Sequence, residues 1–254
     1  MNKELIRRNF SRFARYYDKY STVQNLCASR LAERIAANNL DKILDVGCGT
    51  GNYTKLLRDK FPLAEIKALD ISQEMIEIAR NKLQDRRTEF IIADGEAVDF
   101  TEQFDFITSN ACFQWFEDLE GAIAKYRILL KKNGFILFSI FGPLTFYELN
   151  ESLRELFKKE GLITSSNFFE KNKLNEILEK HFKRAMIEED VLIERFNSTS
   201  ELLNKIRYTG IRGNGLSIRH LWTAKMLDKL QKVYEKKFGN LITTYQVFYC
   251  RATR

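Results

Sequence analysis

A short apolar run in this chain ends directly in a glycine-rich turn. Lys42–Val46 has the length and apolar character of a buried strand, and the segment Tyr53–Lys60 that follows, before Pro62, has helical character. The turn between them has the pattern D-x-G-x-G-x-G, formed by Asp45, Gly47, Gly49 and Gly51. Glycine has no Cβ atom, so the backbone can turn sharply there and approach a bulky ligand closely. The sequence therefore predicts a strand, a turn and a helix that together form a ligand-binding crevice.

The same alternation of strand and helix continues to about residue 142. Further strands are expected at Glu65–Asp70, Glu89–Asp94, Phe104–Asn110 and Gly134–Ile140, with helices at Glu74–Gln84 and Leu119–Leu130. Strands and helices at this spacing indicate crossover connections, and therefore a parallel sheet with both faces covered. The predicted fold class is α/β.

The segments on either side of this core differ from it. Residues 3–38 carry apolar residues at helical spacing and are expected to form helices with a break near Tyr17–Thr22. Ser198 and Glu201 match the capping box that opens a helix. Further helices are expected at Phe146–Lys159, Leu174–His181 and Thr223–Lys237, and further strands at Ala185–Arg195 and Thr243–Arg251. If the last two strands pair, residues 196–242 form a helical insertion over one edge of the sheet.

A chain of 254 residues is long enough for one α/β domain with an insertion. We expect a single domain in five parts: an N-terminal helical cap at 1–40, a cofactor-binding core at 41–142, lid helices and a strand at 143–195, a helical insertion at 196–242 and the last strand at 243–254.

Composition indicates a folded, soluble protein, with 44% hydrophobic residues, 30% charged residues and only 2 prolines. No stretch reaches the roughly 18 apolar residues of a membrane span, so a cytoplasmic location is expected. The 4 cysteines are scattered and there are only 2 histidines, so no metal site is expected. The net charge of +7 indicates either an anionic partner or solvated helix faces.

Polar residues end three consecutive predicted strands. Asp70 ends the second, where a carboxylate can accept hydrogen bonds from ribose hydroxyls, and Asp94 ends the third, where it can accept one from an adenine amino group. Asn110 ends the fourth strand. The turn departs from the dinucleotide fingerprint because Asn52 replaces its third glycine. Any one of these residues could be structural, but the ordered combination predicts a cofactor site.

These residues, in this order, resemble the motifs of class I S-adenosylmethionine-dependent methyltransferases. A narrower resemblance, across almost the whole chain, is to the malonyl-acyl-carrier-protein O-methyltransferases that begin pimelate assembly in biotin synthesis. The segments that carry it are Arg7–Asp18 with Gln24, Ser109–Trp115, Lys205–Gly210 and Thr244–Phe248. The resemblance implies a Rossmann-like, mostly parallel seven-stranded sheet with helices on both faces, an N-terminal helical cap and a helical insertion before the last strand.

The resemblance also implies that S-adenosylmethionine binds at the glycine-rich turn and leaves as S-adenosylhomocysteine, without a metal. The cofactor-binding residues that it assigns are Asp45, Gly47, Cys48, Gly49, Gly51, Asp70, Ile71, Met75, Asp94, Gly95 and Asn110. Tyr17 either folds over the cofactor and positions it or packs against another helix. A guanidinium group suits a substrate carboxylate, so Arg207 and Arg212 are candidates to bind it, although each could equally be a surface charge.

Members of this family methylate the free carboxylate of a malonyl thioester. That carboxylate is ionised at neutral pH, so no general base is required, and catalysis reduces to positioning and the removal of water. The expected partner is malonyl-acyl carrier protein or malonyl-CoA, with no stable nucleic-acid partner and no membrane, and the enzyme is expected to be a monomer. Acyl carrier proteins are acidic, so the basic composition of this chain would be complementary in charge to such a partner. The candidate docking residues are Lys158, Lys159, Arg207, Arg212, Arg219 and Lys225.

Three other functions remain open at this stage. A nucleic-acid methyltransferase suits the basic charge, but Asn110 is followed by Ala111, Cys112 and Phe113, without the prolines common in enzymes that methylate exocyclic amines. A methyltransferase for small free carboxylic acids, similar to those for aconitate-type acids, is barely excluded by the motifs. A non-catalytic binding module is disfavoured by the intact glycines and acids.

Overall fold

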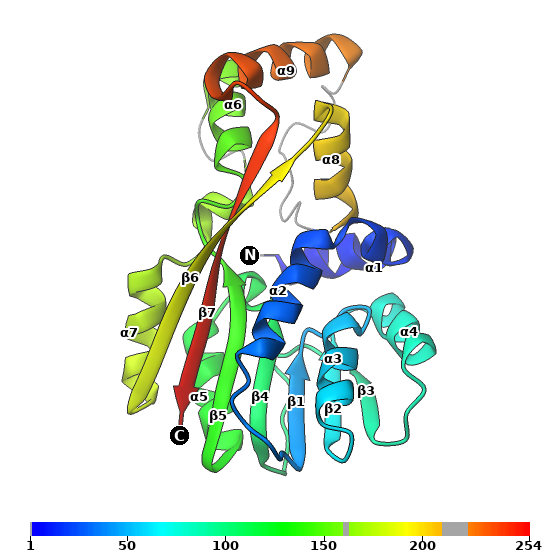
Figure 1. The fold of residues 1–254 in the computed structure, drawn as a ribbon, viewed down its shortest axis with the longest axis vertical. Helices are drawn as coiled ribbons and strands as arrows, with labels where there is room; N and C mark the ends of the chain where they lie inside the picture. The colour runs from blue at the N-terminus through cyan, green and yellow to red at the C-terminus, as the bar shows by residue number, and fades with distance from the viewer. Residues whose placement is uncertain (1, 160–162, 210–222) are drawn as a thin grey trace.

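The computed structural model describes residues 2–159, 163–209 and 223–254 (Figure 1). Seven strands in these residues form one sheet in the order β3-β2-β1-β4-β5-β7-β6. The strands are β1 (Lys42–Val46), β2 (Glu65–Asp70), β3 (Thr88–Ile92), β4 (Phe104–Asn110), β5 (Leu130–Phe141), β6 (Arg184–Arg195) and β7 (Ile242–Thr253). The first five are parallel, whereas β7 runs antiparallel to both β5 and β6. The predicted α/β class and the mostly parallel sheet are confirmed.

Helices cover both faces of the sheet. The helices are α1 (Lys3–Tyr20), α2 (Thr22–Glu33), α3 (Asn52–Lys60), α4 (Gln73–Lys82), α5 (Leu119–Leu129), α6 (Tyr147–Phe157), α7 (Lys171–His181), α8 (Thr199–Tyr208) and α9 (Ala224–Phe238), with short 3-10 turns at Phe113–Trp115 and Thr164–Asn167. Successive strand residues point to opposite faces. Ile43 therefore joins a core with α2, α3 and α4, while Leu44 joins a second core with α5 and α7. The sheet is thus buried on both sides, as its continuous apolar strands predicted.

Helices α8 and α9, in the insertion before the last strand, lie elsewhere than predicted. β6 and β7 pair from Arg184 with Thr253 to Arg195 with Ile242, forming a long hairpin that extends past the carboxyl ends of the parallel strands (Figure 1). At the end of this hairpin, α8 packs on α1 and α9 packs on α6. These two helices therefore lie above the sheet and not over its edge, where the insertion was predicted, because the hairpin carries them there; residues 210–222 lie outside the described residues.

Several predicted element boundaries also differ, most of all those of α2 and β5. The N-terminal helices break at Ser21 as predicted, but α2 ends at Glu33, five residues before the predicted end. Ile35 is buried without being helical. Its spacing from the preceding apolar residues therefore indicated a buried position and not a further turn of helix. β5 begins at Leu130 instead of Gly134, because Leu130 pairs with Phe104 ahead of a register shift. No described helix is long and apolar enough to cross a membrane.

Candidate active site

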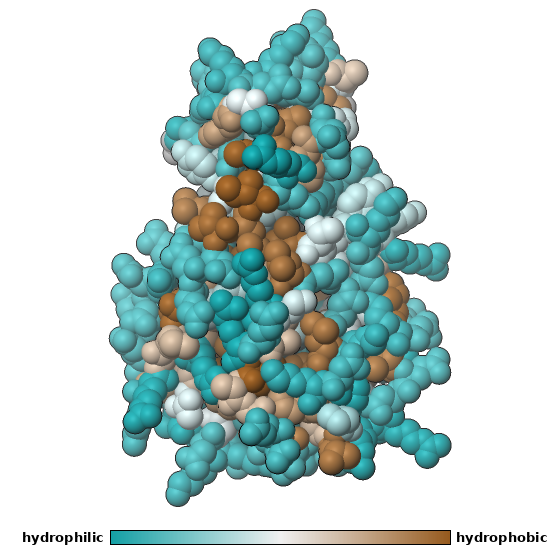
Figure 2. All heavy atoms as spheres, in the orientation of Figure 1, coloured by the Kyte–Doolittle hydropathy of each residue, from teal (hydrophilic) through white to brown (hydrophobic). Residues whose placement is uncertain are grey.

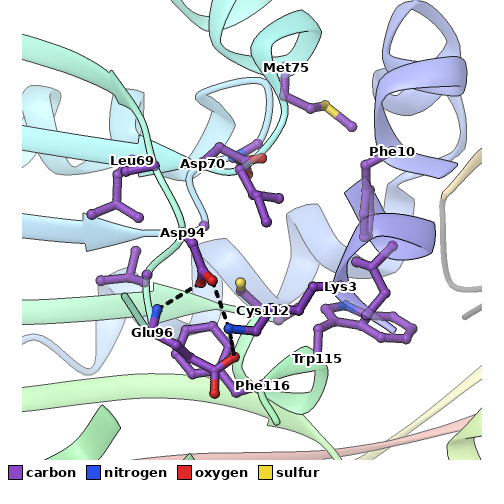
Figure 3. Close-up of a pocket in the computed structure, with 18 of the residues that line it drawn as sticks. Lys3, Phe10, Leu69, Asp70, Met75, Asp94, Glu96, Cys112, Trp115 and Phe116 are labelled. Carbon is purple, nitrogen blue, oxygen red and sulfur yellow. Dashed lines mark hydrogen bonds and ion pairs between the residues drawn. The ribbon is translucent and has the colours of Figure 1, made fainter. Parts of the chain in front are cut away.

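A cavity of about 90 Å³ lies where the carboxyl ends of β1 to β4 meet α1 (Figure 3). Its walls come from the four loops that follow these strands and from one face of α1. The lining residues are Lys3, Ile6, Phe10, Tyr17, Val46, Gly47, Gly49, Leu69, Asp70, Ile71, Met75, Ala93, Asp94, Gly95, Glu96, Asn110, Ala111, Cys112, Trp115 and Phe116. This is the crevice position at which open α/β sheets bind ligands.

The turn after β1 requires glycine for two separate reasons. Gly47 has a φ of +74°, and a Cβ atom there would lie 2.2 Å from the Sγ atom of Cys112. Gly49 has a φ of +55°, but a Cβ atom there would have no neighbour within 4 Å, because the space in front of it is open. The turn therefore packs tightly against the loop after β4 at one glycine and faces free space at the next.

Asp70, at the end of β2, is held by main-chain donors. Its Oδ2 atom accepts a hydrogen bond of 2.9 Å from the N–H of Gly49, and its Oδ1 atom accepts one of 2.9 Å from the N–H of Ser72. Ser72 also caps α4, accepting from the N–H of Met75 at 3.2 Å. Burial raises the pKa of Asp70 to about 6, although these hydrogen bonds oppose the rise. The carboxyl group is thus fixed in position on the cavity wall and is ionised at neutral pH.

Asp94 follows β3 instead of ending it, since the strand stops at Ile92. Its Oδ1 atom accepts a hydrogen bond of 2.9 Å from the N–H of Glu96, and its Oδ2 atom forms an ion pair of 2.7 Å with the ammonium group of Lys3. Tyr126 of α5 also holds this loop, because its hydroxyl donates a hydrogen bond of 2.8 Å to the carbonyl oxygen of Gly95. The predicted acceptor therefore lies on the cavity wall, two residues beyond the end of the strand.

Asn110 lines the cavity, but its amide group is already bonded to other parts of the protein. Its Nδ2 atom donates to the carbonyl oxygen of Gln24 at 3.0 Å, and its Oδ1 atom accepts from the hydroxyl of Ser139 at 2.7 Å. Asn110 therefore joins the end of β4 to α2 of the cap.

Aromatic side chains close the cavity on the side of the cap. Phe10 lies 6.3 Å from Tyr17 and 6.1 Å from Trp115 between ring centroids, and the ring of Trp115 is edge-on to that of Phe10. Burial raises the pKa of Tyr17 and that of the Cys112 thiol, so both side chains are protonated and neutral at physiological pH. The part of the wall formed by Phe10, Tyr17, Cys112 and Trp115 is therefore uncharged.

Four of the predicted residues do not line the cavity. Asp45 is fully buried behind the turn, where its Oδ2 atom accepts a hydrogen bond of 2.7 Å from Thr54 and burial raises its pKa to about 7. Cys48 and Gly51 also lie outside the lining. Arg207 is exposed on α8, with its guanidinium group 5.6 Å from the ring centroid of Phe13. Arg212 and Arg219 lie outside the described residues.

Sequence analysis missed several residues of the cavity wall. These are chiefly Lys3, Phe10, Glu96, Cys112 and Trp115. For α1 a usable pattern existed, because residues 3, 6, 10 and 17 recur at helical spacing and so share one face. No pattern in the sequence, however, indicated that this face would meet the carboxyl ends of the strands.

Comparison with known proteins identifies the family. Residues 44–138 match the model of the methyltransferase domain family. Malonyl-[acyl-carrier protein] O-methyltransferase 1 of Ilyobacter polytropus is 36% identical over 94% of this chain and 89% of its own length. The Bacillus anthracis malonyl-[acyl-carrier protein] O-methyltransferase is 32% identical over 100% of this chain and 98% of its own. A putative methyltransferase structure from Bacillus halodurans, at 15% identity, superposes with a TM-score of 0.61 over 89% of this chain and 97% of its own.

Sheet order, glycine turn and family match together define a class I S-adenosylmethionine-dependent methyltransferase. Within that class, the near full-length identity above 30% shows that the chain belongs to the malonyl-[acyl-carrier protein] O-methyltransferase family.

Proposed function

We propose that this enzyme transfers the methyl group of S-adenosylmethionine to the free carboxylate of a malonyl thioester carried on acyl carrier protein, an early step of biotin synthesis. The observation that carries the proposal is the cavity at the ends of β1 to β4, with two fixed carboxyl groups on its wall, in a chain that matches this family over nearly its whole length.

The cavity suits S-adenosylmethionine in the chemistry of its walls. Asp70 would accept hydrogen bonds from the ribose hydroxyls and Asp94 one from the adenine amino group, while Ile71 and Met75 supply apolar contact. The open space in front of Gly49 admits the bulky cofactor close to the main chain. When bound, the cofactor supplies an electrophilic methyl group on a sulfonium.

The residues of the chain would act by positioning and by excluding water. The substrate carboxylate is ionised at neutral pH, so it is nucleophilic without a base. Tyr17 and Cys112 are neutral on the cavity wall and compete with it neither as bases nor as nucleophiles. Phe10, Tyr17 and Trp115 form an apolar cover that would keep water from the reacting charges. Within this cover, Tyr17 would position the cofactor.

The carrier protein would dock on the basic helices above the sheet. Lys158 and Lys159 at the end of α6 and Lys225 on α9 are exposed, and Figure 2 shows a hydrophilic surface over α9. An acidic partner would be steered to such a surface by charge. Arg207 is exposed on neighbouring α8 and is retained as a candidate for contact with the substrate carboxylate or the carrier.

The test is the identity of the product. Incubation with methyl-labelled S-adenosylmethionine and malonyl-acyl carrier protein should place label on the carrier as a methyl ester, released as methanol by mild alkali. Butyryl-acyl carrier protein has the same carrier but no free carboxylate, and it should remain unlabelled. Label on both carriers, or label that resists alkali, would contradict carboxyl methylation.

A further inference from the structure

Helix α1 is fastened to three of the four loops that form the cavity. Asp18, near its end, accepts a hydrogen bond of 2.5 Å from Thr50 in the glycine turn. Ser11, in its middle, is hydrogen-bonded at 3.0 Å to Ser72 after β2. Lys3, at its start, is ion-paired with Asp94 after β3. The helix therefore lies across the cavity along its whole length and is closed over it.

The closed helix forms one wall of the cavity. Four residues of α1, namely Lys3, Ile6, Phe10 and Tyr17, form part of its wall. A ligand bound in this cavity would therefore contact α1 as well as the loops after the strands.

The contact at Lys3 uses the same carboxyl group that the adenine amine requires. The Nζ atom of Lys3 lies 2.7 Å from Oδ2 of Asp94 and 2.8 Å from Oε2 of Glu96 (Figure 3). The other oxygen of Asp94 already accepts from the N–H of Glu96. With α1 closed, each oxygen of Asp94 therefore already has one partner, and the partner of Oδ2 is a charged one.

The position of Lys3 in its own helix does not explain this arrangement. A cation in the first turn of a helix is disfavoured by the helix dipole, which prefers negative charge there. The two carboxylates of the loop after β3 offset that cost. The favourable partners of Lys3 thus lie across the cavity, and they are lost when α1 opens.

We propose that Lys3 is an internal competitor for the adenine site: its ammonium group holds Asp94 and keeps α1 closed in the empty enzyme, and the adenine amino group takes its place when the cofactor binds. The proposal rests on the function proposed above, in which Asp94 accepts the adenine amine. Cofactor binding then exchanges one partner of Asp94 for another. Because the Lys3 contact must be broken, the net affinity for the cofactor is lower than it would be without that contact.

The test compares two single-charge removals on the same helix. Lys3→Met keeps the length of the side chain and removes the competing charge, whereas Arg8→Met removes an exposed charge one turn further along. Calorimetry with S-adenosylhomocysteine should give a dissociation constant about twofold to fivefold lower for Lys3→Met, the range expected for a partly exposed ion pair. Arg8→Met should bind like the wild type.

Hydrogen exchange of the empty enzyme gives a second readout. The amides of α1 should exchange faster in Lys3→Met than in Arg8→Met, because the closed position has lost its contact with the loop after β3. Equal or weaker binding by Lys3→Met, with a wild type that binds normally, would overturn the competitor role and leave the proposed function standing. Absence of S-adenosylhomocysteine binding in the wild type would overturn the proposed function itself, and the competitor role with it.

Discussion

The main-chain N–H of Gly49 donates a hydrogen bond of 2.9 Å to the side chain of Asp70, and so joins the turn after β1 to the end of β2. One carboxyl group therefore serves two purposes: it fixes the glycine turn, and it presents an acceptor to the cavity. Substitution of Asp70 should therefore change the affinity for the cofactor, whereas substitution of an exposed acidic residue should not.

Replacement of Asp70 should weaken cofactor binding. In Asp70→Ala the ribose hydroxyls lose their acceptor and the N–H of Gly49 loses its partner, which should cost about 1–3 kcal/mol of binding free energy. Calorimetric titration with S-adenosylhomocysteine measures the change. Asp59→Ala, at an exposed position of α3, is the matched control and should bind normally. An unchanged affinity in Asp70→Ala would remove this residue from the cofactor site.

The affinity should also depend on pH in one direction. Burial raises the pKa of Asp70 to about 6, so the carboxyl group becomes protonated as the pH falls below that value. A protonated carboxyl group is a poorer acceptor for two hydroxyls, so the dissociation constant of S-adenosylhomocysteine should rise between pH 7 and pH 5. In Asp70→Asn this rise should disappear. A rise of equal size in Asp70→Asn would assign the pH dependence to another group.

The glycine turn should tolerate a methyl group unequally at its two cavity-lining glycines. Gly47→Ala adds left-handed backbone strain of about 1–2 kcal/mol and a clash with Cys112, for which overpacking costs about 1–3 kcal/mol more. Gly49→Ala adds only the strain to the folded state, because no atom lies near its Cβ position. Urea unfolding should therefore show the larger loss of stability in Gly47→Ala. Equal losses would mean that Cys112 moves aside freely.

The core of the fold was predictable from local pattern, because each parallel strand is a short apolar run bounded by a turn. Asp70 and Asp94 were found for the same reason, since polar residues that follow such runs meet at one edge of the sheet. Asp45 belongs to the same motif but points away from the cavity toward Thr54. Motif membership alone does not distinguish a residue that faces the ligand from one that supports the turn behind it.

The contribution of α1 to the site depends on contacts between residues far apart in the chain. Lys3 and Asp94 are separated by 91 positions, and no local pattern relates them. The placement of α8 and α9 also could not be predicted from local sequence. The length of the β6–β7 hairpin carries those helices above the sheet, and the sequence of the insertion does not encode that position.

Charge reversal on the basic helices should separate docking from chemistry. Lys158→Glu, Lys159→Glu and Lys225→Glu together should raise the KM for malonyl-acyl carrier protein several-fold, with a smaller effect at high ionic strength. A malonyl thioester of a small thiol should be methylated nearly as before. The matched control reverses three exposed lysines elsewhere, Lys55, Lys132 and Lys183, and should leave both substrates unaffected. Equal losses with the two substrates would indicate damage to the cavity instead of the docking surface.

Methylation of a carrier-bound malonyl group can be tested by comparing kcat/KM across substrates under one set of conditions. The substrates are malonyl-acyl carrier protein, malonyl-CoA, free malonate, free aconitate and RNA. We expect the highest kcat/KM with malonyl-acyl carrier protein, measurable transfer to malonyl-CoA, and little or no transfer to the free acids or to RNA. A higher kcat/KM with a free dicarboxylic acid or with RNA than with the malonyl thioesters would contradict it.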